Sequence, residues 1–193
     1  VGALLLGLLP ALVHADPPTC TGPVQLLDVG TLNVRGDIAV DGRVMVTTDN
    51  HGLSVWDVTD PLHPQLQGTW RDVRGGYFGK VRLGPRGFAY AAVDSRVGDV
   101  TALEVFDVRN PGRPLPFRRI PGDVGDFDMS GGWLVTASSH LSVYDASDPF
   151  SLPVVCDGCL DLELTGDAGL PGVAVHDGLA VVATWRRVRV VDL

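Results

Sequence analysis

The chain has 193 residues, of which 45% are hydrophobic and 20% are charged, a globular balance that excludes a disordered protein. Lys and Arg number 15 and Asp and Glu 23, so the formal net charge is -8. Because nucleic acids are polyanions that bind through basic patches, we exclude them as partners.

The chain opens with a leucine-rich apolar run over residues 1–13, about the length of the apolar region of a signal peptide. Ala15 ends a small-residue cleavage site, and Asp16-Pro17-Pro18 follows. A membrane-spanning helix needs ~20 apolar residues, so export with cleavage is preferred over anchoring. We therefore expect residues 1–15 to be part of a signal peptide and residues 16–22 a linker. The expected location is secreted, periplasmic or cell-surface, without stable membrane insertion after cleavage.

After an isolated strand predicted at residues 23–28, four similar units follow, each beginning with a short strand of alternating apolar residues. These apolar pairs are Ile38 and Val40, Val81 and Leu83, Phe127 and Met129, and Val173 and Val175. A glycine then introduces a second strand in each unit, at Gly42, Gly87, Gly132 and Gly178. The glycines are 45, 45 and 46 residues apart. So steady a period indicates a tandem array, and ~40–50 residues is the length of one propeller blade.

The third strand of each unit ends in a shared aspartate: Asp57, Asp107, Asp145 and Asp192. In the first three units an Asp-Pro or Asn-Pro turn follows, and then a fourth strand through residues 65–70, 115–120 and 154–156. A ring of carboxylates for a cation is one interpretation of the aspartates. We prefer the simpler one, in which each aspartate caps its turn by accepting backbone N–H groups.

Four strands in each unit, with no helical periodicity after the leader, predict an all-β fold: a β-propeller of four-stranded blades over residues 23–193. The fourth unit stops at Leu193 before a fourth strand, whereas residues 23–28 resemble a fourth strand without partners. Two alternatives stay open: a four-bladed ring closed by its own termini, or part of a larger ring. We favour the larger ring, and expect the reading frame to continue beyond Leu193.

The repeat also resembles a known family. The third strands end in Val-x-Asp or Val-Val-Asp, and Asp-Pro or Asn-Pro and a second proline follow. This pattern is similar to the LVIVD repeat of exported bacterial and archaeal proteins. The resemblance covers residues 36–193. It implies a six- or seven-bladed propeller in a secreted or cell-surface protein without an assigned reaction.

The sharpest local motif is Cys156-Asp157-Gly158-Cys159. A thioredoxin-like redox pair needs its first cysteine at the N-terminus of a helix, whereas here the motif lies at the end of a predicted strand and no helical pattern follows it. Oxidised cysteines are the rule in exported proteins, so we expect a structural disulfide. Cys20 either pairs with one of these cysteines or stays free. A zinc site would need further ligands.

The second unit departs from the repeat in length. From the glycine to the shared aspartate the four units span 15, 20, 13 and 14 residues. The excess lies in a candidate binding loop formed by Ser95, Arg96, Val97, Gly98, Asp99 and Val100. Insertions in a repeat array often make its binding surface, and the alternative is a tolerated loop without function.

No residue is assigned to catalysis, to a cofactor or to a metal. The acidic segment 123–128 allows calcium but lacks the frame of an EF-hand, and Ser138-Ser139-His140 lacks the glycines of a nucleophile elbow. The predicted function is a non-catalytic binding module whose loops contact a protein or glycan. The alternative is a propeller enzyme, such as a metal-dependent hydrolase, with its site in blades absent from this chain. Such a site needs polar inner strands, whereas Ile38, Val81, Phe127 and Val173 are predicted core residues.

Overall fold

The computed structural model describes residues 36–73, 75–94, 101–162, 171–185 and 187–193. These residues form four antiparallel sheets, each with its strands in chain order. The first contains β1 (Ile38–Asp41), β2 (Val44–Asp49), β3 (Gly52–Asp57) and β4 (Gln65–Arg71). The second contains β5 (Tyr77–Gly84), β6 (Phe88–Asp94), β7 (Thr101–Asp107) and β8 (Leu115–Pro121), with a short 3-10 turn at Pro85–Gly87. The third contains β9 (Asp126–Ser130), β10 (Trp133–Ala137), β11 (His140–Asp145) and β12 (Val154–Asp161), and the fourth contains β13 (Gly172–His176), β14 (Leu179–Ala183) and β15 (Val188–Asp192).

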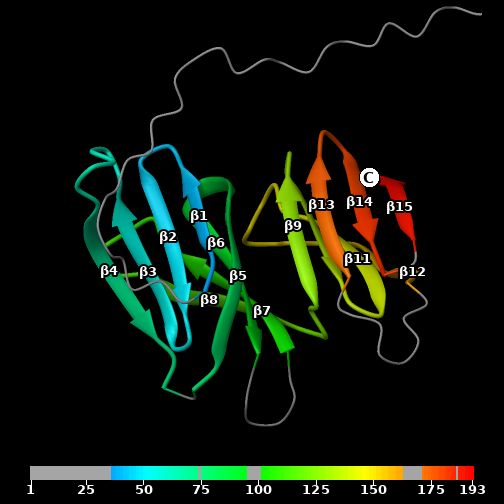
Figure 1. The fold of residues 1–193 in the computed structure, drawn as a ribbon, viewed down its shortest axis with the longest axis horizontal. Coiled ribbons are helices and arrows are strands. Elements are labelled where there is room, and N and C mark those ends of the chain that lie inside the picture. Colours follow the sequence, from blue (N-terminus) through cyan, green and yellow to red (C-terminus); the bar gives the residue numbers. More distant parts are fainter. Residues whose placement is uncertain (1–35, 74, 95–100, 163–170, 186) are drawn as a thin grey trace, which may run out of the picture.

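The prediction of an all-β fold is therefore confirmed, and the four sheets are consistent with a β-propeller-like architecture. Figure 1 shows the first strands of the sheets, β1, β5, β9 and β13, towards the middle of the molecule. The outer strands β4 and β12 lie towards its periphery. The described residues contain no helix long and apolar enough to span a membrane.

The repeated glycines have a backbone reason. Gly42, Gly87, Gly132 and Gly178 have φ angles of 57°, 75°, 89° and 77° and precede β2, β6, β10 and β14. This left-handed region is strained for residues with a Cβ atom, and glycine adopts it without that strain. The glycines therefore make the tight turn that connects the first and second strands of each sheet.

Neighbouring sheets pack face to face through hydrophobic clusters. The first and second sheets share a cluster that includes Val46, Val55, Phe78 and Phe106. A second cluster, which includes Phe88, Phe127 and Leu134, lies between the second and third sheets. The third lies between the third and fourth sheets and includes Val135, Val173 and Val182. Each sheet thus buries apolar side chains that it could not bury alone.

One predicted core residue is exposed. Val81, Phe127 and Val173 are buried as expected, because this repeat position packs towards the preceding sheet. Ile38 occupies the same position in the first sheet but is 46% exposed. The prediction for Ile38 was wrong because no described sheet precedes the first one.

The third sheet also differs from expectation. Its fourth strand was predicted over residues 154–156, whereas β12 runs from Val154 to Asp161. Cys156 is therefore not at the end of the strand, and Cys159 lies within it as well. Several predictions fall on residues that the structure does not describe: the signal peptide, the linker, the strand at residues 23–28, Cys20 and the candidate binding loop at residues 95–100.

Candidate functional site

Three aromatic rings fill the junction between the first and second sheets. Trp70 of β4 lies 5.6 Å from Phe78 of β5 and 5.0 Å from Phe106 of β7, measured between ring centroids. The centroids of Phe78 and Phe106 are 6.1 Å apart. These are edge-to-face and tilted contacts, which aromatic rings prefer. The space between the two sheets is therefore occupied by apolar side chains.

The same three repeat positions at the next junction are Ile120, Val124 and Tyr144, where Val124 precedes Phe127 by three residues as Phe78 precedes Val81. Ile120 and Val124 are smaller than the rings they replace, and Tyr144 adds a hydroxyl group. A cavity of about 420 Å³ lies at this junction, with all three side chains in its lining. We call it the junction pocket. At two of these three positions, the rings of the first junction are replaced by smaller aliphatic side chains.

Polar groups make up much of the pocket lining. The hydroxyl groups come from Thr136, Ser138, Ser139, Ser142 and Tyr144, and the carboxylates from Asp123 and Asp157. Ile120, Pro121 and Val124 form an apolar wall beside them. None of the described lining residues is Lys or Arg. The pocket thus offers hydrogen-bond donors and acceptors next to an aliphatic surface, and its described lining carries the carboxylates of Asp123 and Asp157.

A bulge in β12 shapes one side of the pocket. Opposite β11, Leu160 pairs with Leu141 and Cys156 with Val143, so residues 157–159 lie opposite Ser142 alone. In the first and second sheets a single residue lies opposite the corresponding position. The third sheet therefore has two extra residues here. A disulfide between Cys156 and Cys159, whose Cα atoms are 5.6 Å apart, closes this bulge.

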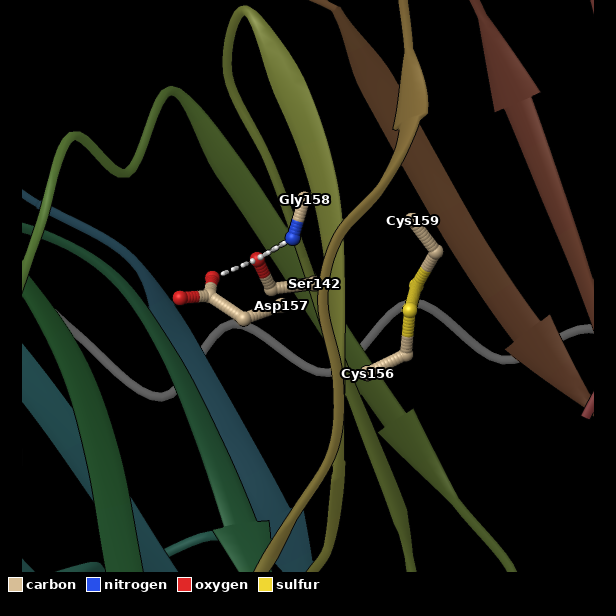
Figure 2. The surroundings of a disulfide bond; sticks show 5 residues. All are labelled: Ser142, Cys156, Asp157, Gly158 and Cys159. Carbon is tan, nitrogen blue, oxygen red and sulfur yellow. Dashed lines mark hydrogen bonds between the residues drawn. A yellow bond between two sulfur atoms is a disulfide. The ribbon is translucent and has the colours of Figure 1, made fainter.

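The bulge presents Asp157 to the pocket. Ser142 Oγ donates a hydrogen bond of 2.9 Å to Asp157 Oδ1, and the Gly158 N–H donates one of 3.2 Å to Ser142 Oγ. Figure 2 shows this pair to one side of the strand and the disulfide to the other. Burial and then the nearby Asp157 carboxylate raise the pKa of Tyr144. The phenol therefore keeps its proton and remains a hydrogen-bond donor.

The rim of the pocket adjoins the candidate binding loop in sequence. Six residues separate β6 from β7, whereas two residues separate the corresponding strands in the first and third sheets. Thr101, the first residue of β7, lies with its Oγ1 3.0 Å from Gly122 O and 3.1 Å from Asp123 Oδ1. The same oxygen accepts a 3.1 Å hydrogen bond from the Val124 N–H. The residue that follows the candidate loop is thus bonded to three residues of the pocket lining.

The histidines that the structure describes lie at separate places in the fold. His140 Nδ1 lies 2.9 Å from Oγ of its neighbour Ser139, at the pocket. His63 pairs with Asp60 in the turn after β3, and His176 with Asp177 after β13. Within the described ranges, no group of three or more His, Cys, Asp or Glu residues could hold a metal ion.

The shared aspartates lie in separate turns. Oδ1 of Asp57, Asp107 and Asp145 accepts the backbone N–H two residues later, at 2.8, 3.0 and 2.9 Å. Hydrogen bonds from that residue's side chain and backbone lower the pKa of each carboxyl group. These are Asx turns, and the three carboxylates do not form a ring around a cation. Asp192 ends β15.

The sequence interpretation missed a set of ion pairs between charged side chains on the first strands of the sheets. Lys80 Nζ lies 2.7 Å from Asp126 Oδ1. Arg82 reaches two other sheets, with its Nε 2.8 Å from Asp128 and a terminal nitrogen 3.0 Å from Asp37. Asp126 and Asp128, which belong to the acidic segment 123–128, lie on β9. Their carboxylates contact cationic side chains instead of forming a calcium loop.

These carboxylates also bond the next sheet. Asp37 accepts the Val81 N–H at 3.1 Å, Asp126 accepts the Val173 N–H at 2.8 Å, and Asp128 accepts the Val175 N–H at 2.8 Å. Each N–H belongs to the first strand of the following sheet, which is an edge strand among the strands that the structure describes. The sequence contained a signal for these ion pairs, because Asp126-x-Asp128 lies 46 residues after Lys80-x-Arg82, about one repeat length.

Comparisons with known proteins bear on the fold alone. No family model matches the chain, and no curated protein matches it. A solved structure that is similar is the crystal structure of Kluyvelomyces marxianus Hsv2, with a TM-score of 0.51 and 16% sequence identity. The match covers 81% of this chain but 47% of that one, so the chain spans about half the length of Hsv2. A likeness at this identity supports the all-β, propeller-like fold and nothing about activity.

Proposed function

We propose that the chain is a non-catalytic, exported or cell-surface binding module that holds a protein or a glycan at the junction pocket and the adjoining loop. The observation that carries the proposal is that two departures from the repeat meet at this pocket and a third ends at Thr101, which is hydrogen-bonded to the pocket lining. They are the smaller side chains of the second junction, the two-residue bulge in β12 and the six-residue connection before Thr101. A scaffold needs its repeat positions, whereas departures from the repeat are free to serve a partner.

The chemistry of the pocket favours binding over catalysis. His140, the histidine in its lining, contacts the hydroxyl of the adjacent Ser139 and not a carboxylate. Asp157 contacts Ser142, and Asp123 contacts Thr101, so both carboxylates have neutral hydroxyl partners. This arrangement suits hydrogen bonding to a ligand more than proton transfer. The similarity to the LVIVD repeat supports an exported location.

The test is a deletion of residues 95–100 in the full chain. We expect binding to intact cell surfaces and to immobilised glycan and protein panels to fall at least tenfold. Thermal melting should change little, because shortening a loop alters its closure entropy only logarithmically, ~0.6 kcal/mol per doubling of length. The matched control is Leu62→Ser, an exposed residue in the turn that follows β3. Undiminished binding by the deletion, or equal loss in the control, would contradict the proposal.

A further inference from the structure

The geometry points to a neutral carbohydrate as the ligand of the junction pocket. This inference rests on the proposed binding function and names the ligand class. The ligand site is the pocket itself, and its lining residues are among those that the structure describes.

The shape of the site is the first argument. A protein partner usually covers a flat patch of ~800 Å² on each side of an interface. The junction pocket is instead a hollow of about 420 Å³, within the range of ~300–1,000 Å³ that small ligands occupy. It therefore fits one end of a chain molecule or a small ligand that enters between the second and third sheets.

The hydrogen-bonding groups are the second argument. Hydroxyl groups such as those of Ser138 and Tyr144 both donate and accept, whereas the Asp157 carboxylate only accepts. An ammonium group offers donors alone and would leave the hydroxyl donors without acceptors. A sugar offers several neighbouring hydroxyl groups that donate to a carboxylate and accept from serine or tyrosine. The lining thus matches a polyol better than a cation.

Charge is the third argument. The lining contains Asp123 and Asp157 and, among the described residues, neither Lys nor Arg, so an anionic sugar or phosphate would meet carboxylates and no permanent positive charge. The whole chain has a formal net charge of -8, which adds to the repulsion. The aliphatic side chains of Ile120, Pro121 and Val124 lie beside these polar groups. They suit the apolar C–H face of a pyranose ring.

A variant that fills the pocket can be designed from the side chains of the first junction. Trp70 and Phe78 occupy there the positions that Ile120 and Val124 occupy at the pocket. The double substitution Ile120→Trp with Val124→Phe therefore places side chains in the pocket that the same fold already accommodates one sheet earlier. We expect this variant to fold, to melt cooperatively and to lose carbohydrate binding.

A second variant tests the polar side without filling the pocket. Asp157→Asn keeps the shape of the side chain and removes its charge, and should weaken binding about tenfold, because a charge-assisted hydrogen bond becomes a neutral one. The charge-matched control is Asp41→Asn, an exposed residue at the end of β1 in the first sheet. It should bind as the parent does.

The measurement is titration calorimetry of the full chain with maltotriose, cellotriose, chitotriose and lactose, and with sialyllactose and spermidine as anionic and cationic probes. Saturable binding of at least one neutral sugar, lost in the filled variant and weakened in Asp157→Asn, is the expected result. Binding of sialyllactose or spermidine alone would overturn the inference, as would unchanged binding by both pocket variants.

The outcomes separate this inference from the proposed function. If no sugar binds but cell-surface binding persists and depends on residues 95–100, the ligand class is wrong and the binding module stands. Capture of a protein whose binding is lost in the filled variant would likewise replace the carbohydrate with a protein partner. If neither sugars nor surfaces bind, both proposals fail.

Discussion

At the scale of single residues, the shared aspartate has one local role in three sheets. Its side chain accepts the backbone N–H two positions later, at Thr59, Arg109 and Ser147, and so closes the turn before the fourth strand. Because the hydrogen bonds need the charged form, they lower the pKa of Asp57, Asp107 and Asp145. A group whose pKa is lower in the folded state stabilises the fold above its unfolded pKa.

This predicts a stability that falls in acid. The ordinary pKa of aspartate is about 3.9, so the contribution is complete above roughly pH 5 and is lost as the pH falls through the lowered folded values. Replacing all three aspartates by asparagine keeps an acceptor in each turn but removes the titration. Denaturant unfolding at pH 7 and pH 3 should therefore differ less in the triple variant than in the parent. An equal pH dependence in both proteins would show that other carboxylates are responsible.

At the scale of the element, the aromatic position of the third strand and a facing position of the second strand are either both polar or both apolar in the first three sheets. Trp56 of β3 donates its indole N–H to Thr47 Oγ1 of β2 at 3.0 Å. In the third sheet, Tyr144 of β11 and Thr136 of β10 occupy the same two repeat positions. In the second sheet the corresponding residues are Phe106 and Ala91, and both are apolar. At this repeat position, a polar aromatic residue thus occurs where the adjacent strand supplies a hydroxyl group. Buried polar groups are costly without a partner, which explains the pairing.

We predict that Phe106→Tyr lowers the free energy of unfolding by about 1–3 kcal/mol, because a hydroxyl group is buried without a partner. Adding Ala91→Thr supplies the threonine found at this position in the first and third sheets. The two substitutions should couple favourably by about 1 kcal/mol in a double-mutant cycle measured by denaturant unfolding. Tyr144→Phe is the comparison in the third sheet and should cost less, because that side chain borders the pocket. Simple additivity of the two substitutions would contradict this account.

At the scale of the whole molecule, charged side chains on the inner strands join one sheet to the next. Arg82 of β5 contacts Asp37 before β1 and Asp128 of β9, so one side chain links three sheets. The aspartates in turn accept N–H groups from exposed edges of the following sheets. An edge strand with unpaired N–H groups can pair with a strand of another chain. Here the carboxylates accept hydrogen bonds from these N–H groups instead.

We predict that Arg82→Met destabilises the chain by about 1–3 kcal/mol, because two carboxylates lose their cationic partner while the aliphatic stem is kept. The cost lies below that of a fully buried pair, since the Arg82 and Asp37 side chains are 31% and 39% exposed. The matched control is Arg86→Met, whose pair with Asp148 is 60% and 40% exposed and should contribute less than ~1 kcal/mol. Equal melting temperatures for the two variants would refute a linking role for Arg82.

Much of each sheet was predictable from the sequence. Alternating apolar residues, the glycines at a period of about 45 residues and the shared aspartates located most strands, because these signals depend on the backbone within one unit. The end of β12 and the burial of Ile38 were not predicted correctly. The two-residue bulge let β12 continue past Cys159, which a pattern of simple alternation does not reveal. Ile38 matched its repeat counterparts but lacks a described sheet on its outer side.

The sequence by itself thus determined the all-β class, the repeat and its turns, whereas the tertiary structure decided which units meet and what lies between them. Ile120, Val124 and Tyr144 line one pocket only because β8 and the strands of the third sheet lie against each other. Arg82 pairs with residues 45 and 46 positions away, on either side of it. Periodicity along a strand tells which side chains share a face. Contacts between faces arise from the packing of whole sheets, and no local pattern encodes them.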